Sequence, residues 1–110
     1  MAYNEKLASR VGEILGQQPG LIARKMFGGV GYMLNGNMAC GILNDDLIVR
    51  VGAESYQEAL AQPHTKVFDT RGGRPMTGWV MVEPAGTASD GDLETWVRRG
   101  AKFAATLPPK

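Results

Sequence analysis

The dipeptide Asn35-Gly36 constrains the fold of this chain more than any other feature of the sequence. A two-residue type I′ turn needs a positive φ at both central positions, which asparagine tolerates and glycine adopts freely. Segments rich in apolar residues flank the dipeptide, at 30–34 before it and at 37–43 after it. We therefore predict a β-hairpin, in which these two segments pair as antiparallel strands.

Further strands follow and precede this hairpin. The short turn Asn44-Asp45-Asp46 leads into 47–51, so that three consecutive strands form an antiparallel meander. Strict alternation places Val49 on one face of the last strand and Arg50 on the other. Residues 23–27 form a strand before the hairpin, which the glycines that follow it interrupt.

Three helices accompany these strands. Residues 3–15 carry apolar side chains at helical spacing, and a glycine follows them as a stop signal. Residues 53–62 are predicted as a second, shorter helix that ends at a proline. The last helix begins at a cap provided by Ser89 or Asp90.

Two strands, 66–69 and 76–82, lie between the second and third helices. The complete order is α-β-β-β-β-α-β-β-α. This order indicates an α+β fold of two layers, a mainly antiparallel β-sheet with helices packed on it. A length of 110 residues predicts a single domain that spans 1–110.

The charge balance and the hydropathy pattern exclude several classes of function. Twelve Lys and Arg residues against 11 Asp and Glu give a net charge of +1, so direct nucleic-acid binding is not expected. No segment approaches the roughly 20 apolar residues of a membrane span, and the N-terminus does not resemble a secretion signal. We expect a cytoplasmic protein that does not associate with membranes.

A catalytic or metal-binding set is not expected. Cys40 is the single cysteine and His64 the single histidine, and a cysteine between apolar strand residues is typically inert. Asp45 and Asp46 are explained by turn formation, and the segment 90–92 lacks the remaining ligands of a calcium loop. The sequence therefore predicts no catalytic residues, no metal and no cofactor.

Arginines are the polar residues with the most suggestive positions. Arg24 and Arg50 lie in predicted strands, and a loop contains Arg71, Gly72, Gly73 and Arg74. A glycine-rich loop between arginines can present amide and guanidinium N–H groups to an anion or a carboxylate, which makes these residues a candidate binding site for a partner or an anion. The alternative is that each arginine pairs with a surface acid or covers apolar neighbours.

Both tryptophans fall on apolar periodicities, Trp79 in the last strand and Trp96 in the last helix. We predict core packing for both. An exposed Trp79 beside Arg74 would instead indicate a surface for a partner, because tryptophan is enriched at binding hot spots.

Several motifs, taken together, resemble one protein family. They are Arg24-Lys25-Met26-Phe27-Gly28-Gly29-Val30, Asn35-Gly36-Asn37-Met38, Leu47-Ile48-Val49-Arg50-Val51-Gly52, Gly73-Arg74-Pro75-Met76-Thr77-Gly78-Trp79-Val80 and Leu93-Glu94-Thr95-Trp96-Val97. The chain resembles the N-terminal domain of the TfoX/Sxy family, whose founding members regulate natural competence in bacteria. The likeness extends over nearly all of residues 3–105.

The resemblance implies a two-layer α+β fold, a bacterial cytoplasmic protein and a link to transcriptional control together with the cyclic-AMP receptor protein. It implies no catalytic residues. Founding members carry a second, helical domain, and the sequence here ends at Lys110, so we expect a stand-alone form.

Two hypotheses of function follow. In the first, the chain is a non-enzymatic regulatory domain that binds another protein. In the second, it binds a small molecule or an anion, and is conceivably an enzyme, through an arginine-lined surface. The identity of the partner and the oligomeric state are left open.

Overall fold

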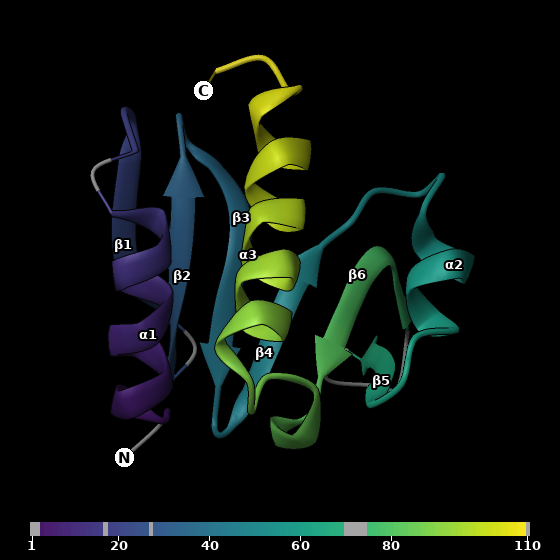
Figure 1. The fold of residues 1–110 in the computed structure, drawn as a ribbon. Coiled ribbons are helices and arrows are strands. Elements are labelled where there is room, and N and C mark those ends of the chain that lie inside the picture. Colours follow the sequence, from purple (N-terminus) through teal and green to yellow (C-terminus); the bar gives the residue numbers. More distant parts are fainter. Residues whose placement is uncertain (1–2, 17, 27, 70–74, 110) are drawn as a thin grey trace.

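The computed structural model describes residues 3–16, 18–26, 28–69 and 75–109, and its element order confirms the predicted one (Figure 1). The elements are α1 (Glu5–Leu15), β1 (Leu21–Met26), β2 (Gly29–Leu34), β3 (Asn37–Leu43), β4 (Asp46–Arg50), α2 (Tyr56–Leu60), β5 (Thr65–Asp69), β6 (Pro75–Val82), the 3-10 helix η1 (Pro84–Gly86) and α3 (Asp90–Ala105). The protein is therefore an α+β fold.

The six strands form one sheet in the order β1-β2-β3-β4-β6-β5, and every neighbouring pair is antiparallel. The predicted meander is present as β2, β3 and β4. The predicted hairpin turn is also present, since Asn35 has φ 53° and Gly36 has φ 85°. The chain then skips one place, so that β6 lies beside β4 and β5 forms the outer edge.

The helices lie on one face of the sheet. Figure 1 shows α1 and α3 in front of the strands, and α2 contributes Tyr56 and Ala59 to the same core. That core takes alternate residues of the strands, including Cys40, Leu47 and Val49. The side chains that alternate with these along each strand therefore point to the other face of the sheet.

Polar caps begin the two longer helices. The Asn4 side chain accepts a hydrogen bond of 3.0 Å from the backbone N–H of Leu7, and the Ser89 hydroxyl accepts one of 3.1 Å from the N–H of Asp92. Each cap satisfies one N–H group that has no partner within its own helix. Ser89, rather than Asp90, is thus the cap of α3.

Helix α3 approaches the sheet most closely at Gly100. A β-carbon placed there would lie 2.3 Å from the carbonyl oxygen of Ala39 and 3.3 Å from a methyl group of Val49. The absence of a side chain at Gly100 therefore sets the separation between the helix and strands β3 and β4. Ala39 itself lies where the register between β2 and β3 shifts, which adds one residue to β3.

Candidate binding surface

No described helix lies across the second face of the sheet, which we call the uncovered face, although Phe103 of α3 reaches Arg50 at one end of it (Figure 1). Its residues alternate with those of the core along each strand. They include Ile22, Arg24, Gly31, Met33, Met38, Gly41, Asp46, Ile48, Arg50, Lys66, Trp79 and Met81.

The centre of the uncovered face is apolar and contains three methionines. Met33 and Met38 are cross-strand partners, and both are half-buried. A β-carbon at Gly41 would lie 2.6 Å from the terminal methyl carbon of Met38, so the methionine side chain extends across the glycine. Ile48 faces Met81 in the register and is only 5% exposed, although no described helix covers it. Methionines give such a surface the ability to adapt its shape to a partner.

Arg50 and Trp79 are cross-strand partners at one end of this face. The guanidinium carbon of Arg50 lies 5.1 Å from the centroid of the Trp79 ring and 5.6 Å from that of Phe103. The Trp79 ring is in turn 6.5 Å from that of Phe68. These distances are typical of cation–π and aromatic contacts. The Arg50 guanidinium therefore contacts the rings of both Trp79 and Phe103.

The prediction that both tryptophans pack in the core is wrong for Trp79 and confirmed for Trp96. Trp96 is 8% exposed within the core, with Arg99 above its ring at 5.4 Å. Trp79 lies half-buried on the uncovered face. Almost every residue of β6 is apolar, so its composition could not show which set of alternate side chains meets the helices.

Of the predicted set of arginines, the structure describes Arg24 and Arg50, and it places these two far from each other. Arg24 is exposed on β1, and β1 lies three strands from β4, which carries Arg50. At about 4.8 Å between neighbouring strands, this places their backbones roughly 14 Å apart across the sheet. The Arg50 guanidinium lies against Trp79 on β6, on the side of β4 away from β1, so the two side chains do not converge on one anion. Arg71, Gly72, Gly73 and Arg74 lie outside the described residues.

The charges of the uncovered face are not balanced. Lys66 on β5 is 3.6 Å from the carboxylate of Asp46 and 3.5 Å from that of Glu83. Within the described part of the chain, no carboxylate lies at salt-bridge distance from Arg24 or Arg50. Among the described residues, the face therefore combines an apolar centre with two cations, Arg24 and Arg50, that have no carboxylate partner and lie at separate positions.

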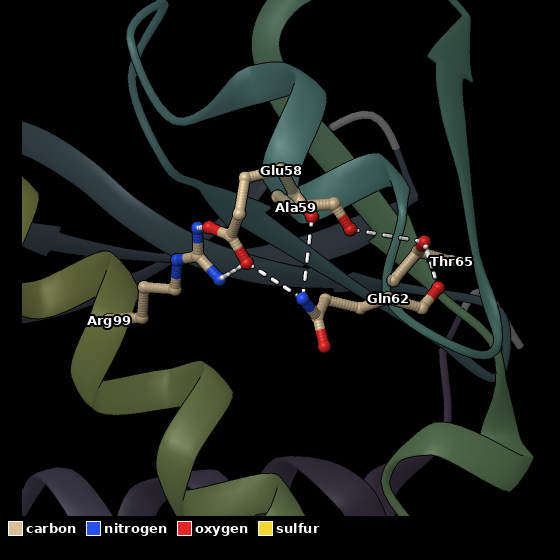
Figure 2. Close-up of polar contacts among 5 residues, drawn as sticks. All are labelled: Glu58, Ala59, Gln62, Thr65 and Arg99. Carbon is tan, nitrogen blue, oxygen red and sulfur yellow. Dashed lines mark hydrogen bonds and ion pairs between the residues drawn. The ribbon is translucent and has the colours of Figure 1, made fainter.

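A cleft of about 280 Å³ lies between α2 and α3, and His64 and Trp96 are among its lining residues. Figure 2 shows its main contact, in which the Glu58 carboxylate binds Arg99 and also accepts a hydrogen bond of 2.7 Å from the Gln62 amide. The hydrogen bond from Arg99 lowers the pKa of Glu58 below its ordinary value of 4.5. Because Glu58 and Arg99 bind each other, we interpret them as a structural contact between α2 and α3 and not as groups that bind a ligand in the cleft.

Thr65 supports the end of α2 in the same region. Its hydroxyl lies 2.7 Å from the carbonyl of Gln62 and 3.2 Å from that of Ala59 (Figure 2). It thereby contacts a carbonyl group of the last turn of α2 and another in the segment that follows the helix. The turn from α2 into β5 is held by this contact.

Cys40 has the environment of a structural residue. It is completely buried, and burial raises the pKa of its thiol to about 12. His64 is exposed at the end of α2. Among the described residues, no group of three or more His, Cys, Asp and Glu side chains is arranged to hold a metal ion.

Comparisons with known proteins give one match. The family model described as the TfoX N-terminal domain matches residues 13–104. No curated protein and no solved structure matches the chain. Within the described residues, no helix has the length and hydrophobicity that crossing a membrane requires.

Proposed function

The chain belongs to the TfoX N-terminal domain family, and from this membership we propose that it is a non-enzymatic, regulatory domain that binds another protein. The proposal places this role in the control of transcription in the bacterial cytoplasm. The family is not a known family of enzymes. The proposed binding surface is the uncovered face of the sheet.

The observation that carries the proposal is the combination of residues on the uncovered face. Contiguous apolar surface with a polar rim is typical of interaction sites in soluble proteins. Methionine, tryptophan and arginine are the residue types that interfaces favour, and this face has Met33, Met38, Met81, Trp79 and Arg50.

The charges of this face support a partner of one chemical kind. Arg24 and Arg50 have no carboxylate at salt-bridge distance among the described residues. A partner that brings carboxylates to these two positions, and apolar side chains to the methionines between them, would complement the surface. The proposed partner is therefore a protein with an acidic and apolar surface.

The proposal is tested by quantitative capture of partners from a bacterial lysate with the wild type and two variants of equal charge. Met81→Glu puts a carboxylate in the uncovered face, and Gln57→Glu makes the same change of charge on the exposed side of α2. We expect one stoichiometric partner, whose enrichment falls at least tenfold with Met81→Glu and is unchanged with Gln57→Glu.

Two outcomes would contradict the proposal. Persistent absence of a stoichiometric partner would argue against a protein-binding function. A partner lost equally from both variants, or from neither, would show that the uncovered face is not the binding surface. Thermal melting of each variant establishes that it is folded before capture.

A further inference from the structure

Among the described residues, nothing pairs with the outer backbone edge of strand β1. The N–H of Asn35 donates a hydrogen bond of 2.9 Å to the carbonyl of Gly20, in the same register as the ladder between β1 and β2. Hydrogen-bonded pairs alternate along an antiparallel ladder, so Ile22 and Arg24 bond to β2. The N–H and C=O groups of Ala23 and Lys25 therefore point away from the sheet. In the described residues, β2 is the single strand that pairs with β1.

The opposite edge of the sheet is protected in ways that β1 is not. Strand β5 contains a register shift between Val67 and Asp69, and Lys66 is engaged with two carboxylates. Irregular register and short length discourage the addition of another strand. Strand β1 instead keeps one continuous register with β2 over all six of its residues.

The side chains of β1 are exposed and basic. Ile22 is 60% exposed, and Arg24 and Lys25 are also exposed. Among the described residues, neither cation has a carboxylate at salt-bridge distance. The edge thus offers free backbone groups, one apolar contact and two unneutralised positive charges.

We infer that β1 is the docking edge for an extended, acidic segment of the partner, which adds to the sheet as a seventh strand. This inference rests on the proposed function, whose surface it adjoins through Ile22 and Arg24. Backbone hydrogen bonds to Ala23 and Lys25 give the segment its alignment. Its carboxylates lie opposite Arg24 and Lys25, where opposite charges on neighbouring strands stabilise the pairing.

The same charges favour a foreign segment over a second copy of this chain. In the two antiparallel registers with the longest overlap of two β1 strands, the Arg24 residues lie directly opposite or diagonal to each other. That arrangement places like charges within about 8 Å on one face. Basic residues on an edge strand are a common barrier to self-association.

The experiment removes the outward N–H of Ala23 without touching the ladder to β2. Proline is tolerated in an edge strand where the lost N–H faces solvent, so Ala23→Pro is expected to remain folded. Ala23→Val is the matched control, because it keeps the N–H and adds a side chain suited to a strand. Melting curves of both variants verify the fold.

The probe is a displayed library of peptides of about ten residues, the length of a long strand, built from Val, Thr, Glu and Lys. We expect the selected peptides to be rich in glutamate and to shift the amide signals of Ala23 and Lys25 in nuclear magnetic resonance spectra. Their affinity should fall at least tenfold for Ala23→Pro and stay within twofold for Ala23→Val.

Several results would overturn the inference. They are a library without binders, peptides that bind Ala23→Pro as well as the wild type, and peptides rich in lysine. Sedimentation that shows a wild-type dimer, converted to monomer by Ala23→Pro, would make a second copy the occupant. If Ala23→Pro keeps the captured partner while Met81→Glu loses it, the docking edge is refuted and the proposed function stands.

Discussion

The two faces of the sheet are made by the same strands and differ in what lies against them. Under the helices, Leu47 and Val49 have no exposed surface. On the uncovered face, among the described residues, neighbouring strand side chains provide most of the cover, Phe103 of α3 reaches Arg50 at one end, and Met33 and Met38 remain half-buried. We therefore expect the core under the helices to contribute more to the free energy of folding than the uncovered face, which would leave that face available for binding without loss of the fold.

Truncation of one apolar side chain on each face tests this difference in stability most directly. We expect Leu47→Ala to lower the free energy of unfolding by about 3 kcal/mol, because it creates a cavity in the closed core. Met81→Ala on the uncovered face should cost about 1 kcal/mol, since its site is half open to solvent. Urea denaturation measures both, and equal losses would show that the two faces contribute equally to stability.

A methyl group added at Gly100, where α3 lies against the sheet, tests how tightly the covered face is packed. Gly100→Ala would bring a β-carbon to 2.3 Å from the Ala39 carbonyl oxygen, so the helix must shift, and we expect a loss of about 2 kcal/mol. Gly91→Ala in the same helix is the control. A β-carbon at Gly91 meets nothing within 4 Å among the described residues, and alanine there should be neutral or stabilising by up to about 1 kcal/mol.

The turn between β2 and β3 determines which side chains reach which face, because a slip of one residue would exchange the two sets. Gly36 has φ 85°, a conformation that β-branched residues rarely adopt. Gly36→Val should therefore cost about 1 kcal/mol or more in thermal melts. Gly36→Asn should cost clearly less, since asparagine tolerates positive φ. Similar losses from both would remove backbone strain as the cause.

The buried thiol of Cys40 predicts that the free energy of unfolding depends on pH in the alkaline range. Its pKa is raised from 9.0 to about 12, so the native state keeps a proton that the unfolded chain begins to lose near pH 9. The contribution to stability is complete below pH 9 and is lost as the pH rises toward 12. At pH 9.5 the loss should be less than about 1 kcal/mol.

Cys40→Val is the control variant, whose stability is measured over the same pH range as that of the wild type. Tyr32 titrates in the same alkaline range, with its pKa raised to about 12, and is present in both proteins. A difference between their stability curves above pH 9 therefore reports the thiol together with its smaller electrostatic effect on the pKa of Tyr32. Parallel curves would contradict the assignment.

The smallest effect is expected at the contact between α2 and α3. The pKa of Glu58 is lowered by its hydrogen bond with Arg99, so the pair stabilises the fold above the ordinary pKa of 4.5 and ceases to do so as the pH falls through the lowered value. Glu58→Gln should make the melting temperature less dependent on pH in the acidic range. An unchanged dependence would show that the pair contributes nothing measurable, as many exposed ion pairs do.

Local patterns in the sequence were sufficient to predict the order of the helices and strands of this fold. The Asn35-Gly36 turn, the alternation in β4 and the apolar spacing of α3 each depend on steric rules that act over a few residues. The opposite orientation of Val49 and Arg50 follows from the same alternation, and the structure confirms it. Motif resemblance identified the family for the same reason, since the motifs mark those turns and strands.

Tertiary structure alone decided how those elements meet. The position of β6 between β4 and β5 depends on pairing between distant residues, and the helices cover one face because of contacts across the whole sheet. The orientation of Trp79 followed from that coverage, because an apolar run such as β6 carries no information about which side will be buried. Gly100 has no sequence signal either, since its role is set by the carbonyl of Ala39, a group 61 positions earlier in the chain. The exposed edge of β1 likewise becomes visible only when the neighbours of every strand are known.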